Sequence, residues 1–159
     1  MIQQLKKIRR QTLVFLTHSM ALPVLKIIRK KKPFPYSTAE LWQMPDGTVG
    51  KDLVQMLQQE QLHLLPYYEK HDVKHVLLGY PTTEEGEVCL QCFMLGNGHI
   101  SFPVMATVLF GLTTMPEHYH AFKNAFQKGR SSTCISSWNY FELIPCYTAQ
   151  LQKIIFPMP

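Results

Sequence analysis

The stretch "HDVKHVLLGYPTTEEGE", residues 71–87, predicts two helices joined by a short turn. The first helix is expected to begin near Pro66, which suits a first helical turn. It should stop at Gly79, because glycine adopts the left-handed conformation that ends many helices. Thr82 and Glu85 form a capping box that starts the second helix. Because the connecting turn is short, the second helix can return antiparallel to the first.

The remaining sequence shows helical periodicity almost throughout. Apolar residues recur at helical spacing over residues 49–59, and Ser37 with Glu40 forms another capping box. Residues 101–114 are strongly apolar, and their length favours a helix over a strand. A last helix is expected over residues 139–155. No segment alternates long enough to build a sheet, so we predict an all-α fold, a single compact domain of about seven helices with short turns.

The composition indicates one globular domain over residues 1–159. Hydrophobic residues make up 46% of the chain and charged residues 17%, which excludes disorder as the main state. No repeat or linker divides the chain, and a chain of this length can bury a core without covalent staples. Its four cysteines therefore need no disulfides, and a reducing compartment is the simpler expectation.

Residues 1–32 differ from the rest in charge, with nine Lys or Arg and no acid, whereas residues 33–159 have seven bases and eleven acids. We expect a basic amphipathic helical segment that binds anionic membrane surfaces. A solvated surface and a secretory signal ending near Ala21 fit the same pattern. The apolar run from Leu13 to Leu25 is too short to span a bilayer, so no transmembrane helix is predicted. No nucleic-acid-binding motif accompanies the basic residues, and we expect no nucleic-acid partner.

In the first predicted helix, His71 and His75 lie one turn apart on the same face, as two ligands of one cation must. Asp72 is close enough to bind the same ion or to orient one imidazole. Glu87, from the next helix, would join the group when the turn folds. Two imidazoles with carboxylates suit zinc, manganese or ferrous iron better than calcium or magnesium, which prefer shells of oxygen atoms.

From the residues alone, two questions about this group stay open. The pair of histidines also fits a solvated helix face with a half-buried His75, and for a bare H-x-x-x-H pair this reading is favoured about two to one. If a metal binds, two imidazoles and one carboxylate with open positions would look like a non-haem iron site. Four ligands in a closed tetrahedron would look like a structural zinc site.

The order HD-x-x-H, then eleven residues, then E resembles the metal-binding signature of the fourth coenzyme Q (ubiquinone) biosynthesis protein family. The spacing from His71 to Glu87 agrees in full. The family's longer pattern H-x-L-x-G-x-x-T-T-x-x-G-E is matched at His75, Leu77, Gly79, Thr82, Thr83, Gly86 and Glu87. The similarity is strong over residues 71–95 and weaker over residues 36–155.

The resemblance implies an all-α fold and a divalent metal, zinc in the first place and iron or manganese otherwise. The ligands it implies are His71, Asp72, His75 and Glu87. It also implies a prenylated quinone precursor or another isoprenoid lipid as ligand, other quinone-biosynthesis enzymes as partners, and a homodimer. The protein would then lie peripherally on the inner face of the cytoplasmic membrane or, in a eukaryote, on the matrix side of the mitochondrial inner membrane.

The same resemblance implies one of two activities in ubiquinone biosynthesis. The protein would either support ring modification, such as oxidative decarboxylation at the ring carboxyl of a prenylated hydroxybenzoate, or act without catalysis. In the second case it would be a scaffold or prenyl-lipid carrier with a structural metal. Tyr80 and Arg130 are candidates to contact a headgroup near the metal.

Other features are assigned no role in this chemistry. Cys89 and Cys92 form a lone CxxC inside a predicted helix, without the second pair of a zinc site or the strand of a thioredoxin motif. His118 and His120 fall on different sides of a helix and cannot bind one ion together. An apolar stripe in a later predicted helix is interpreted as core rather than as the lining of a lipid pocket. This stripe comprises Phe102, Met105, Leu109 and Leu112.

Overall fold

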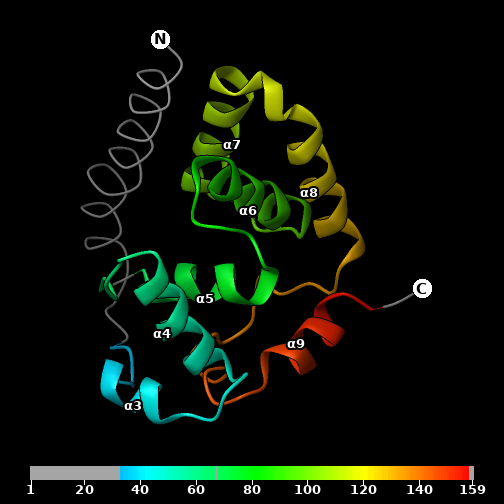
Figure 1. The fold of residues 1–159 in the computed structure, drawn as a ribbon. Coiled ribbons are helices and arrows are strands. Elements are labelled where there is room, and N and C mark those ends of the chain that lie inside the picture. The colour runs from blue at the N-terminus through cyan, green and yellow to red at the C-terminus, as the bar shows by residue number, and fades with distance from the viewer. Residues whose placement is uncertain (1–32, 67, 158–159) are drawn as a thin grey trace. The chain divides into compact units, whose positions relative to one another are not determined.

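The computed structural model describes residues 33–66 and 68–157 of the chain. Over these residues it contains seven α-helices, one 3-10 helix and no strand (Figure 1). The elements are α3 (Thr38–Gln43), α4 (Val49–Gln59), α5 (Glu69–Leu78), α6 (Glu84–Gly96), α7 (Phe102–Thr114), η2 (Pro116–His118), α8 (Tyr119–Ser131) and α9 (Thr148–Ile155). The predicted all-α fold of about seven helices is confirmed. The amphipathic helix predicted within residues 1–32 lies outside the described residues.

Contacts among the described residues group the helices into two compact units. Residues 83–131 hold α6, α7, η2 and α8. Residues 33–82 and 132–157 hold α3, α4, α5 and α9. The predicted division of the chain into residues 1–32 and 36–155 remains a prediction.

In residues 83–131, α6 is the central helix, because both α7 and α8 pack against it (Figure 1). Helices α6 and α8 approach each other at two glycines, Gly96 and Gly129. A Cβ atom on Gly129 would lie 3.1 Å from the amide nitrogen of Asn97 and would overlap the carbonyl group of Phe93. Asn97 Nδ2 donates a hydrogen bond of 3.0 Å to the carbonyl oxygen of Gly129. The two helix backbones are therefore in direct contact, which the absence of a side chain permits.

In the other unit, the segment that leads into α9 holds the start of α4. The amide of Val49 donates a hydrogen bond of 2.9 Å to the carbonyl oxygen of Cys146. The hydroxyl of Thr148 donates one of 2.6 Å to the Asp52 carboxylate. Helix α9 also contacts α5, and the capping box predicted at Ser37 is confirmed at the start of α3. Long-range hydrogen bonds thus tie the two ends of this unit together.

Two helix starts near the turn of residues 79–83 differ from the prediction. Helix α5 begins at Glu69, a few residues after Pro66. The N-cap of α6 is Thr83 instead of Thr82, and the Thr83 hydroxyl accepts a hydrogen bond of 3.1 Å from an amide of the first turn. Adjacent threonines offer the same capping chemistry, so the local sequence could not choose between them.

The helix predicted over residues 139–155 is wrong in its first half, because α9 covers only Thr148–Ile155 and the residues before it form turns. Pro145 disfavours the helical conformation of the preceding residue, Ile144. The carbonyl oxygen of Ile144 instead accepts a hydrogen bond of 2.9 Å from the amide of Gly50. A carbonyl group that a helix would use internally is therefore committed to α4.

The interpretation of the α7 stripe as core is wrong. The four stripe residues are exposed, and they are Phe102, Met105, Leu109 and Leu112. The buried residues of α7 are Val104, Thr107, Val108 and Gly111. Gly111 approaches Val88 of α6 so closely that a Cβ atom would overlap the Val88 side chain. Because nearly every residue of this segment is apolar, periodicity could not tell its two faces apart.

Cys134 differs from the CxxC pair, Cys89 and Cys92, in exposure and in the direction of its pKa shift. Cys89 and Cys92 are buried in α6, and burial raises their pKa values to about 11 and about 12. Cys134 is exposed, and a hydrogen bond with the Ser136 hydroxyl lowers its pKa. The CxxC pair is therefore part of the core of residues 83–131.

The close approach of α6 and α8 predicts the sign of a stability change. Intrinsic helix propensity favours Gly129→Ala by about 1 kcal/mol. Because the new methyl group would meet backbone instead of a movable side chain, we expect a net loss of about 2 kcal/mol in the free energy of unfolding, measured by urea denaturation.

Gln127→Ala, on the exposed face of the same helix, is the matched control and should change stability by less than about 0.5 kcal/mol. A Gly129→Ala protein as stable as the wild type would show that the two backbones do not touch in solution.

The thiol pKa values predict selective alkylation, because the thiolate is the reactive form. With iodoacetamide at pH 8, Cys134 of the native protein should be modified, whereas Cys89 and Cys92 should stay protonated and unmodified. Peptide mass spectrometry with and without denaturant measures this. Native labelling of the CxxC pair at the rate of Cys134 would contradict the burial.

Candidate metal centre

Helix α5 places His71 and His75 one turn apart with their rings in contact. The ring centroids are 4.7 Å apart and the ring planes meet at 69°. His75 is buried, with 3% of its surface exposed, and His71 is partly exposed. Gly79 ends the helix in the left-handed conformation and donates its amide to the carbonyl oxygen of His75 at 2.9 Å. The predicted helix and its glycine stop thus hold both imidazoles on one face.

The turn after α5 determines which nitrogen of His75 can bind a metal. Nδ1 of His75 lies 2.9 Å from the carbonyl oxygen of Tyr80. A carbonyl oxygen only accepts hydrogen bonds, so Nδ1 must carry the proton. Nε2 is then left with a lone pair, which is the form that coordinates metals. Tyr80 acts here through its backbone, and the headgroup contact predicted for it remains a prediction.

Asp72 lies beside the other imidazole. Its Oδ1 atom is 3.6 Å from Nδ1 of His71, and its side chain is largely buried. A carboxylate next to Nδ1 favours a proton on that nitrogen, which again leaves Nε2 for a metal. At this distance Asp72 is a neighbour of the imidazole, and the orienting role expected from the sequence remains a prediction. Direct binding of Asp72 to an ion remains a prediction.

Glu87 lies in the first turn of α6, where the amides of the helix N-terminus favour negative charge. Only 8% of its surface is exposed, whereas Glu84 and Glu85 in the same turn are more accessible. Nε2 of Gln91, one turn further along, donates a hydrogen bond of 3.2 Å to Oε1 of Glu87. Of the three carboxylates in the first turn of α6, the helix therefore buries only that of Glu87 and fixes its orientation. Its spacing to Gln91 was visible in the sequence, but the contact was not predicted.

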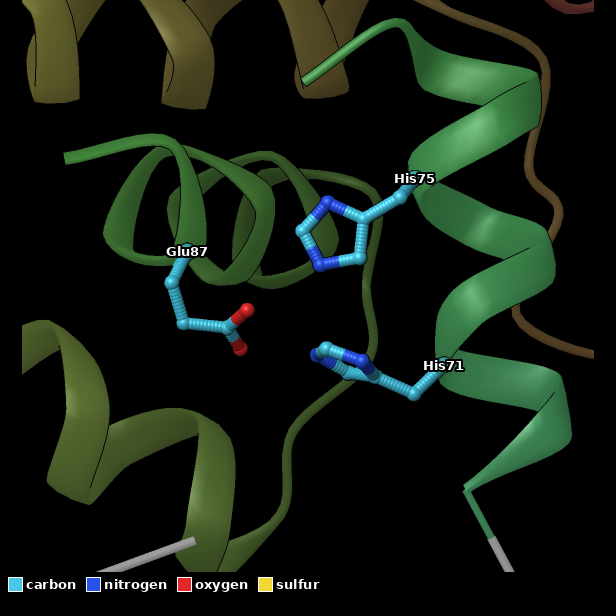
Figure 2. A group of neighbouring side chains, drawn as sticks. All are labelled: His71, His75 and Glu87. Carbon is cyan, nitrogen blue, oxygen red and sulfur yellow. The ribbon is translucent and has the colours of Figure 1, made fainter. Parts of the chain in front are cut away.

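His71, His75 and Glu87 form a group in which one ligand atom from each lies within 4.8 Å of the others (Figure 2). Ligand atoms about 2.0–2.2 Å from one tetrahedral zinc ion lie about 3.3–3.6 Å apart. The three atoms would therefore have to move closer together by up to about 1.5 Å to bind one ion. Three of the four predicted site residues are thus neighbours, and Asp72 is not in the group.

The donor set of this group decides which chemistry it could support. Two neutral imidazoles and one carboxylate fit zinc, ferrous iron or manganese. Three protein ligands leave at least one coordination position open, as in catalytic metal sites. Outside this group, Nδ1 of His118, the first histidine of the "HYH" segment, lies 3.2 Å from Oε1 of Glu85.

His75 also lines a cleft of about 580 Å³ within residues 33–82 and 132–157. The cleft has a mixed lining that includes Met56, Val76, Tyr80 and the hydrogen-bonded pair of Asp52 and Thr148. Its volume lies in the range of small-molecule sites. This cleft could not be predicted from the sequence, because α4, α5 and α9 build it from segments about 100 residues apart.

No protein-family model and no curated protein matches the chain. The fold is similar to the crystal structure from Nostoc punctiforme PCC 73102 of a protein named "Putative ubiquinone biosynthesis protein". The TM-score is 0.64 and the sequence identity 19%, over 96% of this chain and 81% of the other. At this identity the comparison shows that the two proteins share a fold.

Proposed function

We propose that the chain is a metal-binding protein of isoprenoid-quinone biosynthesis, in which His71, His75 and Glu87 hold one divalent cation. The observation that carries the proposal is the buried Glu87 carboxylate with its ligand atom within 4.8 Å of those of two imidazoles. Burial of a carboxylate costs free energy unless opposite charge or hydrogen bonds compensate. A divalent cation would add opposite charge to the hydrogen bond that Gln91 already donates to this carboxylate.

Zinc is the proposed metal, and iron or manganese would use the same ligands. The proton positions support this assignment, because hydrogen bonding at Nδ1 of His75 leaves Nε2 able to coordinate. Asp72 is proposed to hold the ring of His71 in the matching orientation from 3.6 Å. Each imidazole then has an oxygen atom near its Nδ1, as metal-bound histidines usually do.

Two observations support a role in quinone synthesis. The H-D-x-x-H and E spacing of the ligands resembles that of the fourth coenzyme Q biosynthesis protein family, and the shared fold extends to a protein named for ubiquinone biosynthesis. The proposed ligand is a prenylated hydroxybenzoate. Its ring would occupy the cleft beside His75, where the hydroxyl and carboxylate of Thr148 and Asp52 supply polar contacts.

In the catalytic version of this proposal, the ring carboxyl group is replaced by a hydroxyl group. The carbon–carboxyl bond breaks, carbon dioxide leaves, and a carbon–oxygen bond forms with one atom of dioxygen, so half a dioxygen molecule per ring balances atoms and electrons. A bound cation would stabilise negative charge on the phenolate and carboxylate oxygens as a Lewis acid. His75 would position that cation at the wall of the cleft.

The second candidate is a prenyl-lipid carrier or scaffold with a structural metal. A closed shell of four ligands would need Asp72, which lies beside Nδ1 of His71, to turn and join the group. A closed shell leaves no position for a substrate. The two candidates therefore differ in the coordination number of the metal.

The metal site predicts a loss of bound metal in ligand variants. Protein as purified should contain about one equivalent of divalent metal by elemental analysis. Glu87→Gln keeps the size of the side chain but removes its charge, and metal affinity should fall by at least about 100-fold. His75→Asn should have the same effect.

Glu85→Gln and His118→Asn are the matched controls, because they change the same residue types in a neighbouring pair outside the group. Both controls should retain the metal, and circular dichroism should show that all four variants are folded. Unchanged metal content in Glu87→Gln and His75→Asn would eliminate the site.

The catalytic version predicts release of labelled carbon dioxide from a prenylated 4-hydroxybenzoate carrying ¹³C in its carboxyl group, in the presence of dioxygen and metal-loaded protein. Glu87→Gln should abolish the release, since the ring oxygens would lose their cation. Tight binding of the prenylated ligand without carbon dioxide would contradict catalysis and support the carrier.

A further inference from the structure

Helix α7 is apolar on both of its faces. None of its thirteen residues is charged. Its inner face packs on α6, where Gly111 meets Val88. A helix that is apolar all round is normally covered on every side. In α7 only the inner face is covered within the described residues.

The uncovered face carries large side chains at regular spacing. The exposed fractions are 79% for Phe102, 47% for Met105, 63% for Leu109 and 41% for Leu112, and 77% for Ile100 just before the helix. We call these five residues the α7 surface. Their spacing of three and four residues places the four helical members along one line of the helix. Together they form one continuous apolar strip along α7.

The size and the charge of the α7 surface distinguish between possible occupants. A stable protein–protein interface takes about 20–30 residues from each partner, and this strip offers five. Paired helices also use charged residues beside the seam to select each other, and α7 has none. A lipid bilayer needs neither a large area nor charge pairing, and it penalises every buried charge.

The length of α7 determines how it could meet a bilayer. Thirteen residues of helix are about 20 Å long, whereas the hydrocarbon core is about 30 Å thick. No helix in residues 33–66 or 68–157 is long and apolar enough to cross a membrane. The helix would therefore lie along the surface, with Phe102 and Leu109 below the headgroups.

We infer that the α7 surface is the membrane-contact face of this protein and inserts into the boundary between headgroups and acyl chains of a bilayer. One apolar strip gives weak, reversible binding, and stable attachment takes a second signal. Residues 1–32, with nine Lys or Arg and no acid, supply such a signal through attraction to anionic lipids. The inference deepens the proposed role with a prenylated lipid and rests on it, but it does not depend on bound metal.

The test uses sedimentation of the full chain with vesicles of phosphatidylcholine and phosphatidylserine. Phe102→Asp combined with Leu109→Asp should lower the partition coefficient at least about tenfold, because two charges would have to enter the interface. Both positions are exposed, so folding should persist. Ile154→Asp on α9, 54% exposed, is the matched control and should bind as the wild type does. Equal vesicle binding by the double variant would overturn the inference.

A second measurement separates the other possible occupants. Tryptophan at position 102, in Phe102→Trp, should shift its emission to shorter wavelength with vesicles and be quenched by brominated acyl chains. No change on adding vesicles would overturn the inference. The emission could instead be blue-shifted without lipid and return to longer wavelength on dilution. If light scattering then also shows a dimer, the α7 surface would be assigned to contact with a second copy of the chain. A blue shift without lipid that is lost when residues 1–32 are removed would assign it to that segment.

The membrane inference and the metal proposal can be contradicted independently of each other. Glu87→Gln should lose metal and keep its vesicle binding, since Glu87 lies on α6 and is buried. The α7 double variant should keep its metal and lose its vesicle binding. Loss of both properties in either variant would show that α7 acts through the metal group and would overturn the assignment of α7 as a separate surface.

Discussion

The hydrogen bond between Nδ1 of His75 and the carbonyl oxygen of Tyr80 is the constraint on which the site depends. It exists because Gly79 adopts the left-handed conformation, which turns the chain back at the end of α5 and brings the next carbonyl group to the imidazole. One bond thereby fixes the ring orientation and the protonated nitrogen of His75. The turn that ends α5 thus sets which nitrogen of His75 a metal could bind.

The same turn leads into α6, whose first turn carries Glu87. Five residues separate Leu78 from the first residue of α6, so the acid is tethered close to the imidazoles along the chain. Gln91 and the helix N-terminus orient the carboxylate. His75 also lines the cleft, so a cation held by this group would lie beside a space of ligand size.

The sequence predicted the helices and the proximity of His71, His75 and Glu87, because both depend on short-range spacing and on one turn. The sequence did not predict the features that long-range contacts determine. Residues before α9 form turns because the carbonyl oxygen of Ile144 bonds to α4, and the outer face of α7 is exposed because Gly111 selects the opposite face for packing. The Tyr80 contact was also missed, since it involves a backbone atom that no residue type reveals.

X-ray absorption spectroscopy of the protein as purified tests the central claim most directly, because it reports the atoms bound to the metal. The account predicts a divalent metal with nitrogen and oxygen ligands at about 2.0–2.2 Å and the outer scattering of two imidazole rings. Glu87→Gln should lose the signal. Sulfur at about 2.3 Å would place the metal on cysteines and would contradict the account, as would the absence of any metal edge.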